Sequence, residues 1–474
     1  MLGSFLVALG GLVTQVLPGS SPVATNVVIS ALRESTEGRM FGLLVTMAGL
    51  ALLGSAWIHL LAHVHDTVTP ALTRMRTVHL ATAAWSAPLL LAPPLFSRDG
   101  WSYAAQGALT HLGLSPYVWT PSIFDGQIRE AVDPIWMWTP APYGPVPLAW
   151  GSLVAGITDN PWLMVVGYRV LSLLGLVLLA WAIPRLARAA GTEPIRATAI
   201  MLACPLTIVH GVGGVHNDLL MAALMATALA VALEHRWVLG AALAGAAAAV
   251  KIPGGAVAIG VALVSLPLLA AMATRLRRLT TVGVVAVLVV VGAGALIGVG
   301  VGWAEALDTP GLVRTPLSLT TQVAGVVESV ARLVGAGVVE RHALGVLRTL
   351  GLLGAVGYAG WVAVRGRTGD PAYAVRAVAL VMTTFVVLSP AVHAWYLLWA
   401  LPFLVAVRWS RPVDQLIRDT VLALGLIAPL DSSLRGAPVE ILVVAGLAVL
   451  TLVRLRTYQP DPQAGRRSGT SVAA

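Results

Sequence analysis

The chain is a succession of apolar segments, most of them long enough to cross a lipid bilayer as a helix. A bilayer core needs about 20 apolar residues per helix, with a range of about 17 to 25, and shorter segments suffice where helices break inside a protein. We therefore expect an all-α polytopic membrane protein with about 13–14 transmembrane helices. The fourteen candidate spans lie near residues 2–17, 40–62, 79–95, 161–183, 197–212, 217–233, 237–250, 253–271, 280–303, 344–364, 374–389, 393–407, 416–430 and 438–454.

The composition supports a membrane protein and excludes several other classes. Apolar residues make up 57% of the chain and charged residues only 11%, with a mean hydropathy of +0.84, whereas soluble domains carry about 25% charged residues. The single cysteine, Cys204, excludes a disulfide framework and a cysteine-based metal site. The net charge of +9 comes without any run of basic residues, so it indicates membrane orientation and no nucleic-acid partner.

The distribution of arginine predicts the orientation, because basic residues near span ends are retained in the cytoplasm. With a cytoplasmic N-terminus, the connections on that side carry nineteen of the 30 basic residues. The chain is thus expected to be a multi-pass plasma-membrane protein whose residues 457–474, rich in Pro, Gly and Ser, form a disordered cytoplasmic tail. The cytoplasmic basic residues are Arg74, Arg76, Arg185, Arg188, Arg196, Arg236, Arg275, Arg277, Arg278, Arg365, Arg367, Arg376, Arg408, Arg411, Arg418, Arg454, Arg456, Arg466 and Arg467.

The same topology gathers most of the unusual polar residues on the outer side. A functional site is therefore expected at this face. The outer segments are the long loops 96–160 and 304–343, the turns at 212–220 and around Lys251, the segment 388–396 and the turn around Asp431.

Asp99 lies where the third predicted span leaves the membrane, at the start of the longest outer loop. One interpretation is an interfacial salt bridge to Arg98, beside a membrane belt formed by Trp101 and Tyr103. The other is a general base, because a carboxylate at the edge of a low-dielectric region can accept a proton from an attacking hydroxyl. The sequence by itself leaves both open.

The remainder of this loop mixes aromatic and polar residues. Aromatic rings suit lipid headgroups and the C–H faces of a sugar equally well. Long loops tend to be functional, and the Pro-fixed TPAPYGP turn favours a binding role. The residues concerned are Trp101, Trp119, Trp136, Trp138 and Trp150, with Asp125, Gln127, Arg129 and Asp133.

Three consecutive polar residues, His216, Asn217 and Asp218, begin the sixth predicted span. Asn and Asp are favoured helix N-caps, which explains one of them but not all three. The group is also suited to hydrogen bonds with a polyhydroxylated ligand. A metal site from His216 and Asp218 with a further carboxylate stays open, although no spacing enforces it.

Several isolated cations lie on or near the outer face. Lys251, the only lysine among 29 arginines, either snorkels to the interface or binds a lipid phosphate and stabilises it as a leaving group. His393, followed by Trp395 and Tyr396, is either packed without a role or suited to a phosphate or hydroxyl. Arg314 is a further outer cation, and Arg169, inside the fourth span, is expected to face a polar interior.

These residues occur in motifs that resemble a known family. The stretches FSRDGWSYAAQGALTHLGLSPY, TPAPYGPV, GVHNDLLMAALM, AAAAVKIPG and SPAVHAWY are similar, in this order, to those of the actinobacterial polyprenol-phosphomannose-dependent α-1,6-mannopyranosyltransferases of the GT-C superfamily. The resemblance covers roughly residues 80 to 400. Typical members read SRDVYSY where this chain has Gly100 and Trp101 in the corresponding positions, so the aromatic is kept.

The resemblance implies a GT-C membrane domain over residues 1–456 and a catalytic acidic residue in the first large outer loop, a role that falls on Asp99. It implies transfer of mannose from polyprenyl phosphomannose to a lipid-linked α-1,6-mannan of lipomannan or lipoarabinomannan, on the outer side of the membrane. The reaction inverts the anomeric centre and requires no cofactor or metal. We expect Arg98, Lys251, Arg314 and His393 to bind the donor phosphate, and Trp101, Tyr103, Gln106, Trp138, Tyr143, His216, Asn217, Asp218, Trp395 and Tyr396 to bind sugar or acceptor.

Two alternatives remain at the level of sequence. A GT-C enzyme of other specificity, such as an arabinofuranosyl or protein O-mannosyl transferase, would share the geometry. A lipid-linked sugar transporter would also need many spans, but it should show paired repeats or charged residues near mid-membrane. The gathering of charge at one face favours an enzyme.

Overall fold

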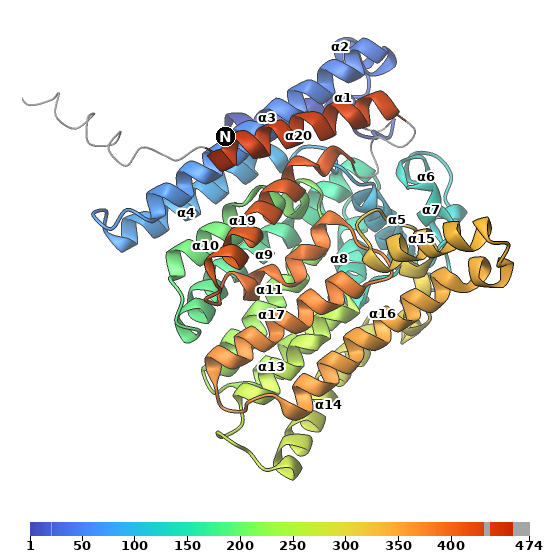
Figure 1. The fold of residues 1–474 in the computed structure, drawn as a ribbon. Helices are drawn as coiled ribbons and strands as arrows, with labels where there is room; N and C mark the ends of the chain where they lie inside the picture. Colours follow the sequence, from blue (N-terminus) through green and yellow to red (C-terminus); the bar gives the residue numbers. More distant parts are fainter. Residues whose placement is uncertain (20, 431–436, 458–474) are drawn as a thin grey trace, which may run out of the picture.

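The computed structural model describes residues 1–19, 21–430 and 437–457, and within these ranges the chain is helical without a strand (Figure 1). The predicted turn around Asp431 and all but the first residue of the predicted tail 457–474 lie outside the described residues. The α-helices are α1 Leu2–Thr14, α2 Val27–Glu34, α3 Thr36–Val64, α4 Ala71–Ser86, α5 Asp99–His111, α6 Gln127–Ala131, α7 Pro134–Met137, α8 Pro145–Ala155, α9 Pro161–Ala189, α10 Pro194–Ala203, α11 Asp218–Leu233, α12 Trp237–Val250, α13 Val257–Val264, α14 Met272–Leu296, α15 Leu319–Leu333, α16 Gly337–Arg365, α17 Pro371–Leu388, α18 Leu401–Leu404, α19 Arg411–Leu426 and α20 Pro438–Thr457. Tighter or wider turns form η1 Ala87–Leu89, η2 Pro121–Ile123, η3 Thr207–Gly213, η4 Ile252–Ala256, η5 Gly302–Leu312, η6 Ala394–Trp399 and η7 Ala428–Leu430.

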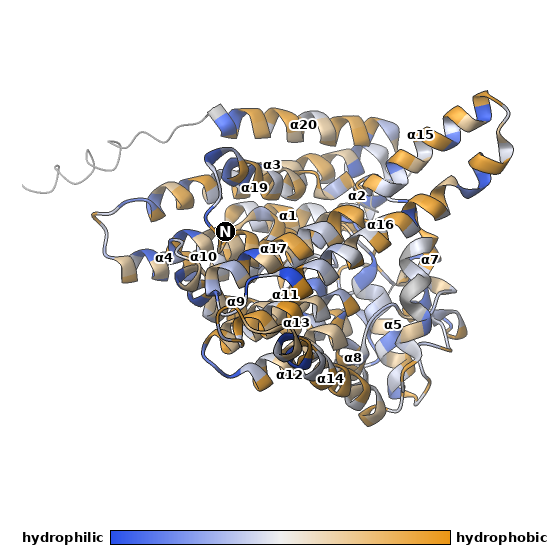
Figure 2. Cartoon of the chain, turned by 60° about the horizontal axis from the view of Figure 1, so that its bottom comes forward, coloured by the Kyte–Doolittle hydropathy of each residue, from blue (hydrophilic) through white to orange (hydrophobic). Residues whose placement is uncertain are grey.

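The structure confirms an all-α polytopic membrane protein. Within the described residues, 6 helices are long and apolar enough to cross a bilayer alone, namely α3, α9, α14, α16, α17 and α20. The pair α10 and η3 adds a bent seventh candidate, and shorter apolar helices include α1, α11 and α12. Figure 2 shows the apolar character of α20 along its length, with hydrophilic residues at its end. The count of 13–14 spans stays a prediction, because the shorter helices cross a bilayer only if it thins or the chain continues past the helix.

Proline interrupts two predicted spans and follows the end of a third. The span predicted at 197–212 bends by 51° between α10 and η3, around Pro205. The span predicted at 393–407 is the short turn η6 followed by the one-turn helix α18, which contains Pro402. Lys251 ends α12 in an extended conformation just before Pro253. Because proline lacks an N–H and disfavours helix in the residue before it, each break turns the chain at a defined point.

The segment 96–160, predicted to be a connecting loop without regular structure, contains the helices α5, α6, α7 and α8, so the prediction of irregular structure was wrong. Residues Asp99 to Thr110 of α5 are all buried, and α5 packs against α8 and α9. A side chain at Gly107 would approach the backbone of Gly151 to 2.7 Å, so small residues let α5 and α8 lie in close contact. Because α5 is buried by neighbouring helices rather than by lipid, its sequence does not need the continuous apolar run of a membrane span.

The segment 304–343, predicted to be the second outer loop, is also largely helical and is tied to the turn that carries the site. Ser318, the N-cap of α15, donates a hydrogen bond of 3.0 Å to the carbonyl of Ser389. Thr321 donates to the carbonyl of Pro390 at 3.1 Å. The helices α15 and α16 pack against each other as a hairpin that projects at one edge of the molecule (Figure 1).

The core lies around α11, almost every residue of which is buried. This helix packs against α9 and α12, and it also contacts α13 and η6. Asp218 is its first residue, so the polar residues next to it lie at one end of this buried helix.

Candidate active site

Asp99 is fixed in place by the backbone that precedes it. Leu95 donates its N–H to the carbonyl of Gly213 at 3.0 Å, which joins this segment to the end of η3. Phe96 has a φ of +63°, a left-handed conformation that places Asp99 at the first turn of α5. Val215, just before His216, has a φ of +60°. Positive φ is unfavourable for such side chains, and strain of this kind gathers at functional sites.

Arg169 holds these two segments together. Its guanidinium donates to the carbonyls of Leu90 and Pro93 at 3.2 Å and of Gly213 at 3.3 Å. The side chain is only 1% exposed, which agrees with the prediction that it faces a polar interior. One side chain thereby joins three backbone carbonyls next to the site.

The carboxylate of Asp99 contacts residues from two other segments. Tyr143 donates its hydroxyl to Oδ2 of Asp99 at 3.5 Å. Nδ1 of His216 lies 3.6 Å from the same oxygen. Within the described residues, His216 is the basic side chain within ion-pair distance of Asp99, and the predicted salt bridge to Arg98 is absent. The alternative of a surface ion pair with Arg98 is wrong.

These neighbours keep the carboxylate ionised. Burial raises the pKa of Asp99, but His216 and the charges of His393 and Lys251 lower it by more, so the pKa lies below that of an ordinary aspartate. An ionised carboxylate at this position can accept a proton.

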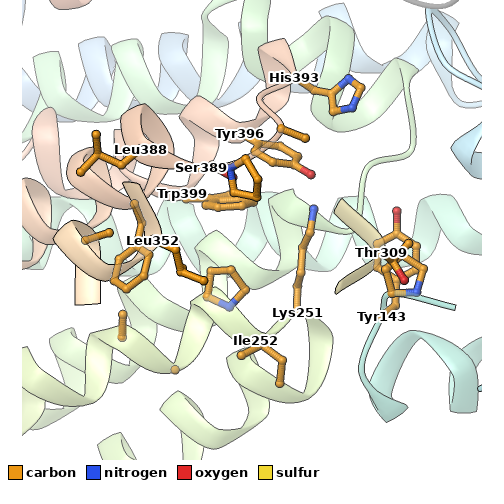
Figure 3. Close-up of a pocket in the computed structure, with 18 of the residues that line it drawn as sticks. Tyr143, Lys251, Ile252, Thr309, Leu352, Leu388, Ser389, His393, Tyr396 and Trp399 are labelled. Atoms are coloured by element: carbon orange, nitrogen blue, oxygen red, sulfur yellow. The ribbon is translucent and has the colours of Figure 1, made fainter. Parts of the chain in front are cut away.

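A cavity of about 630 Å³ adjoins Asp99 (Figure 3). One end is lined by Asp99, Tyr143, Lys251, His393, Tyr396 and Trp399. The remainder, which we call the apolar cavity wall, is formed by Ile252, Ile259, Leu352, Val356, Phe385 and Leu388 from η4, α13, α16 and α17. The cavity thus joins charged groups to a hydrocarbon surface.

Lys251 extends into this cavity between Tyr396 and Trp399 on one side and Tyr143 on the other (Figure 3). Its Nζ donates to Oδ1 of Asp218 at 2.9 Å and lies 4.3 Å from the ring centroid of Tyr396 and 5.0 Å from that of Trp399. The cation is paired and also lies over aromatic faces, which attract it through their quadrupole.

Three rings form a stack beside Asp99. The His216 and Trp395 ring centroids are 3.6 Å apart and nearly parallel, and those of Trp395 and His393 are 4.4 Å apart. Nε1 of Trp395 is buried without a hydrogen-bond partner. A buried indole donor of this kind is suited to a ligand oxygen.

A second, more polar cavity of about 270 Å³ lies on another side of Asp99. It is lined by Ser97, Arg98, Asp133, Arg314 and Thr315, among others. Asp99, Trp136, Val313, His393 and Trp395 line both cavities. Asp99 therefore lies where an apolar and a polar cavity meet.

Comparison with known proteins identifies the family. Residues 1–270 match the model of the α-(1→6)-mannopyranosyltransferase N-terminal domain, and residues 320–457 match the MptB C-terminal domain. The chain belongs to the α-(1→6)-mannopyranosyltransferase family. It is 34% identical over 419 residues to α-(1→6)-mannopyranosyltransferase A of Mycobacterium tuberculosis, which covers 84% of this chain and 77% of that protein. It is 27% identical over 433 residues to α-(1→6)-mannopyranosyltransferase B of Corynebacterium glutamicum, which covers 84% of this chain and 71% of that protein. No solved structure matches the chain.

This α-(1→6)-mannopyranosyltransferase family member is therefore a membrane glycosyltransferase that transfers mannose from a sugar donor to a glycan acceptor. The family consists of enzymes, which sets the transporter alternative aside. The cavities next to Asp99 are the candidate active site.

Eight of the predicted site residues line one or both cavities: Asp99, Arg98, Lys251, Arg314, His393, Tyr143, Trp395 and Tyr396. His216 contacts Asp99, and Asp218 contacts Lys251, each from behind the cavity surface. Tyr103 also lies behind it and donates to the hydroxyl of Tyr143 at 3.3 Å.

The other four predicted residues lie outside both cavities. Trp101 is 1% exposed, packs against Trp162 and donates to the carbonyl of Val16 at 3.2 Å. Gln106 is buried within α5, and Trp138 is 69% exposed. Asn217 precedes α11 without a side-chain cap, so the capping interpretation is wrong for it.

The metal interpretation of His216 and Asp218 is not supported by their contacts. Oδ1 of Asp218 accepts hydrogen bonds from Lys251 and, at 2.6 Å, from Nε1 of Trp399. In the described part of the chain, no three His, Cys, Asp or Glu side chains are placed to hold a metal ion.

Trp136, Asp133, Trp399 and Thr309 line the cavities but were not singled out as site residues. Trp136 and Asp133 belong to the predicted binding loop 96–160, where nothing in the pattern separates them from Trp138 and Asp125. Trp399 is hidden within an apolar run, and Thr309 in a segment without a motif. Close packing explains why glycine stands at position 144 of TPAPYGP. A side chain at Gly144 would collide with the carbonyl of Ala249, and the N–H of Gly144 donates to the carbonyl of Val250 at 3.0 Å. This contact fixes Tyr143 beside Lys251.

Proposed function

We propose that the enzyme transfers mannose from polyprenyl phosphomannose to a lipid-linked α-1,6-mannan acceptor of the lipomannan or lipoarabinomannan type, with Asp99 as the general base. The observation that supports this most strongly is the position of Asp99 between an apolar and a polar cavity. A donor with a hydrocarbon chain and an acceptor made of sugar would each meet the carboxylate from a matching surface.

The apolar cavity wall suits the polyprenyl chain. Its side chains from α13, α16 and α17 offer a hydrocarbon surface beside Lys251, and Leu352 and Val356 stay about half exposed. Contact with apolar side chains or lipid lowers the free energy of such a chain relative to exposure to water. The donor phosphate would then lie at the polar end, near Lys251, with His393, Arg98 and Arg314 as further cations.

The polar cavity suits the end of the acceptor glycan. Trp136 lines both cavities, and sugars pack their C–H groups on aromatic faces. The faces of Trp395 are covered by His216 and His393, so its unpaired indole N–H is the group that it offers to a sugar oxygen. Asp133, Arg314 and Thr315 offer polar groups for hydroxyls. The cavity of about 270 Å³ is small, which favours recognition of the terminal sugar rather than a long glycan.

The chemistry then follows from these positions. Asp99 takes the proton from the 6-hydroxyl of the acceptor mannose as that oxygen forms a bond to the anomeric carbon of the donor. The bond from the anomeric carbon to the phosphate oxygen breaks on the opposite face, and polyprenyl phosphate leaves with the electron pair. A β-linked donor gives an α-linked product, and Lys251 stabilises the leaving phosphate. Tyr143 orients the carboxylate through its hydroxyl.

The proposal places this reaction on the outer side of the plasma membrane, with the N-terminus in the cytoplasm. The alternation of basic connections supports this orientation.

A transfer assay tests the proposal. Purified enzyme in detergent is given polyprenyl phospho-[³H]mannose and a synthetic α-1,6-dimannoside, and the expected product is a labelled α-1,6-trimannoside. Polyprenyl phosphoarabinofuranose as donor, and a Ser/Thr peptide as acceptor, are the comparisons for the other GT-C specificities. Transfer from the arabinofuranose donor in place of the mannose donor, or transfer to the peptide in place of the dimannoside, would overturn the proposed substrates.

A further inference from the structure

The buried pair of Asp218 and Lys251 has an asymmetry between its two partners. Asp218 is 0% exposed and lines neither cavity, whereas Lys251 reaches the polar end of the larger one. The two residues come from the same end of neighbouring helices, because Asp218 begins α11 and Lys251 ends α12. One partner of the pair therefore faces a ligand and the other does not.

A second donor fixes the carboxylate. Nε1 of Trp399 donates to the same Oδ1 that accepts from Lys251, at 2.6 Å and 2.9 Å respectively. The indole comes from η6, the segment that also carries Tyr396 and Trp395. Asp218 thus joins α11, α12 and η6 through one oxygen, and its position is determined by groups on both sides.

The ammonium retains capacity for another partner. A lysine ammonium has three N–H donors. Among the described residues, Nζ of Lys251 donates to Asp218, and the hydroxyl of Tyr396 is a second hydrogen-bonding neighbour, which leaves one donor for a ligand. The rings of Tyr396, Trp399 and Tyr143 surround the cation on other sides. These ring faces limit where the ammonium can move but are weak hydrogen-bond acceptors. An anion in the cavity would therefore be a suitable acceptor for the remaining N–H.

The energetics favour a role beyond stability. Removing two charges from water is costly, and an apolar pair of similar volume is often as stable as a buried ion pair. The pair of Asp218 and Lys251 lies at the edge of a cavity. The position that Asp218 gives to the accessible Lys251 therefore explains the pair better than a gain in stability does.

We infer that Asp218 is a positioning residue that holds the Lys251 ammonium at the polar end of the apolar cavity, where it binds the phosphate of the lipid-linked donor. This inference rests on the proposed function. Asp218 does not contact the donor and acts through Lys251. Trp399 fixes the position of the Asp218 carboxylate.

The first test is the kinetics of Asp218→Asn with polyprenyl phosphomannose and the dimannoside. We expect kcat/KM for the donor to fall by about 10- to 100-fold, with the acceptor KM within about twofold of wild type. Asp419→Asn is the matched control, because it also removes a carboxylate from an ion pair, with Arg456, far along the chain from the site. The control should leave both parameters near wild type.

The pH profile provides a readout that a structural role would not change. Burial lowers the pKa of Lys251, while the charges of Asp218, Tyr396 and Asp99 raise it, and Tyr143 is the other titratable group that faces it. Loss of the Asp218 charge should therefore move the alkaline limb of donor kcat/KM to lower pH. An unmoved alkaline limb in the folded variant would overturn the inference.

A double mutant separates action through Lys251 from independent action. We expect Asp218→Asn to lower donor kcat/KM by less than about threefold when Lys251→Met is already present. An equal loss in both backgrounds would show that Asp218 acts independently, which contradicts the inference.

Two further comparisons keep the test decisive. If Asp218→Asn does not fold, Asp218→Glu retains the charge but displaces it, and donor kcat/KM should still fall; wild-type donor kinetics in this variant would overturn the inference. A wild-type enzyme that does not use polyprenyl phosphomannose overturns the proposed function itself. With an active wild type, the variants test the positioning role alone.

Discussion

Oδ2 of Asp99 lies 3.6 Å from Nδ1 of His216, although helices α6 to α10 separate the two residues in the sequence. The same imidazole stacks on Trp395, which lines both cavities. The carboxylate is thus linked to the aromatic group that faces the ligands, and its ionisation depends on groups from several helices.

This relationship predicts the pH dependence of transfer. His216, His393 and Lys251 together outweigh the effect of burial and hold the pKa of Asp99 below that of an ordinary aspartate. A carboxylate with a lowered pKa stays ionised as the pH falls until the pH reaches that pKa, so Asp99 should cause no loss of kcat/KM between about pH 5 and pH 8. His216→Phe keeps a ring against Trp395 but removes the imidazole that lowers the pKa of Asp99. The pKa of Asp99 should therefore rise, and the acidic limb of kcat/KM should move to higher pH. An acidic limb that is identical in both enzymes would contradict this assignment.

Two tryptophans two residues apart provide a test of the cavities. Trp136 lines both cavities, whereas Trp138 is 69% exposed and lines neither. We expect Trp136→Ala to raise the acceptor KM by about tenfold or more, because a ring that packs on sugar contributes on the order of 1–2 kcal/mol. Trp138→Ala should stay within about twofold of wild type. Equal effects of the two changes, measured by initial rates against dimannoside concentration, would remove Trp136 from the acceptor site.

The comparison of these residues also shows what the sequence alone can reveal. Asp99 and Lys251 stand out because a charge is rare and costly in so apolar a chain, and their motifs are specific. Trp136 and Trp138 do not differ in residue type, and which of them faces a cavity depends on the fold of short helices without a usable period. Trp399 is hidden for another reason, since its hydropathy fits the apolar run around it.

The helices show the same division. The long spans α3, α9 and α16 follow from length and apolarity alone. The buried α5 does not, because its Ala and Gly residues derive their burial from contact with α8 and α9 rather than from an apolar run. The breaks at Pro205 and Pro402 could be predicted as weak points, but their direction depends on packing.

The lipid-binding role of the apolar cavity wall can be tested on one helix. Val356 lines the cavity, while Leu353, nearby on α16, is 62% exposed and does not. Val356→Trp should fill the cavity and raise the KM for a long-chain polyprenyl donor by about tenfold, with less effect on a donor shortened to one or two isoprene units. Leu353→Trp should change neither. A donor KM that is insensitive to Val356→Trp would place the lipid chain elsewhere.

The orientation of the membrane domain is open to cysteine labelling. The only native cysteine, Cys204, is buried, so the background signal should be low. Asp125→Cys, at a fully exposed side chain, should react with an impermeant maleimide in intact cells, and Arg277→Cys should react only after the membrane is permeabilised. Labelling of position 277 but not of position 125 in intact cells would reverse the topology.

The most direct test of the central proposal is mannosyl transfer by purified, folded Asp99→Asn enzyme. The change keeps the size of the side chain but removes its ability to accept a proton, so turnover should fall by about 10² to 10⁴ with donor and acceptor binding little changed. Asp125→Asn, at an exposed carboxylate outside both cavities, is the control and should keep wild-type turnover. Turnover of Asp99→Asn within a few fold of wild type would contradict the assignment of Asp99 as the general base.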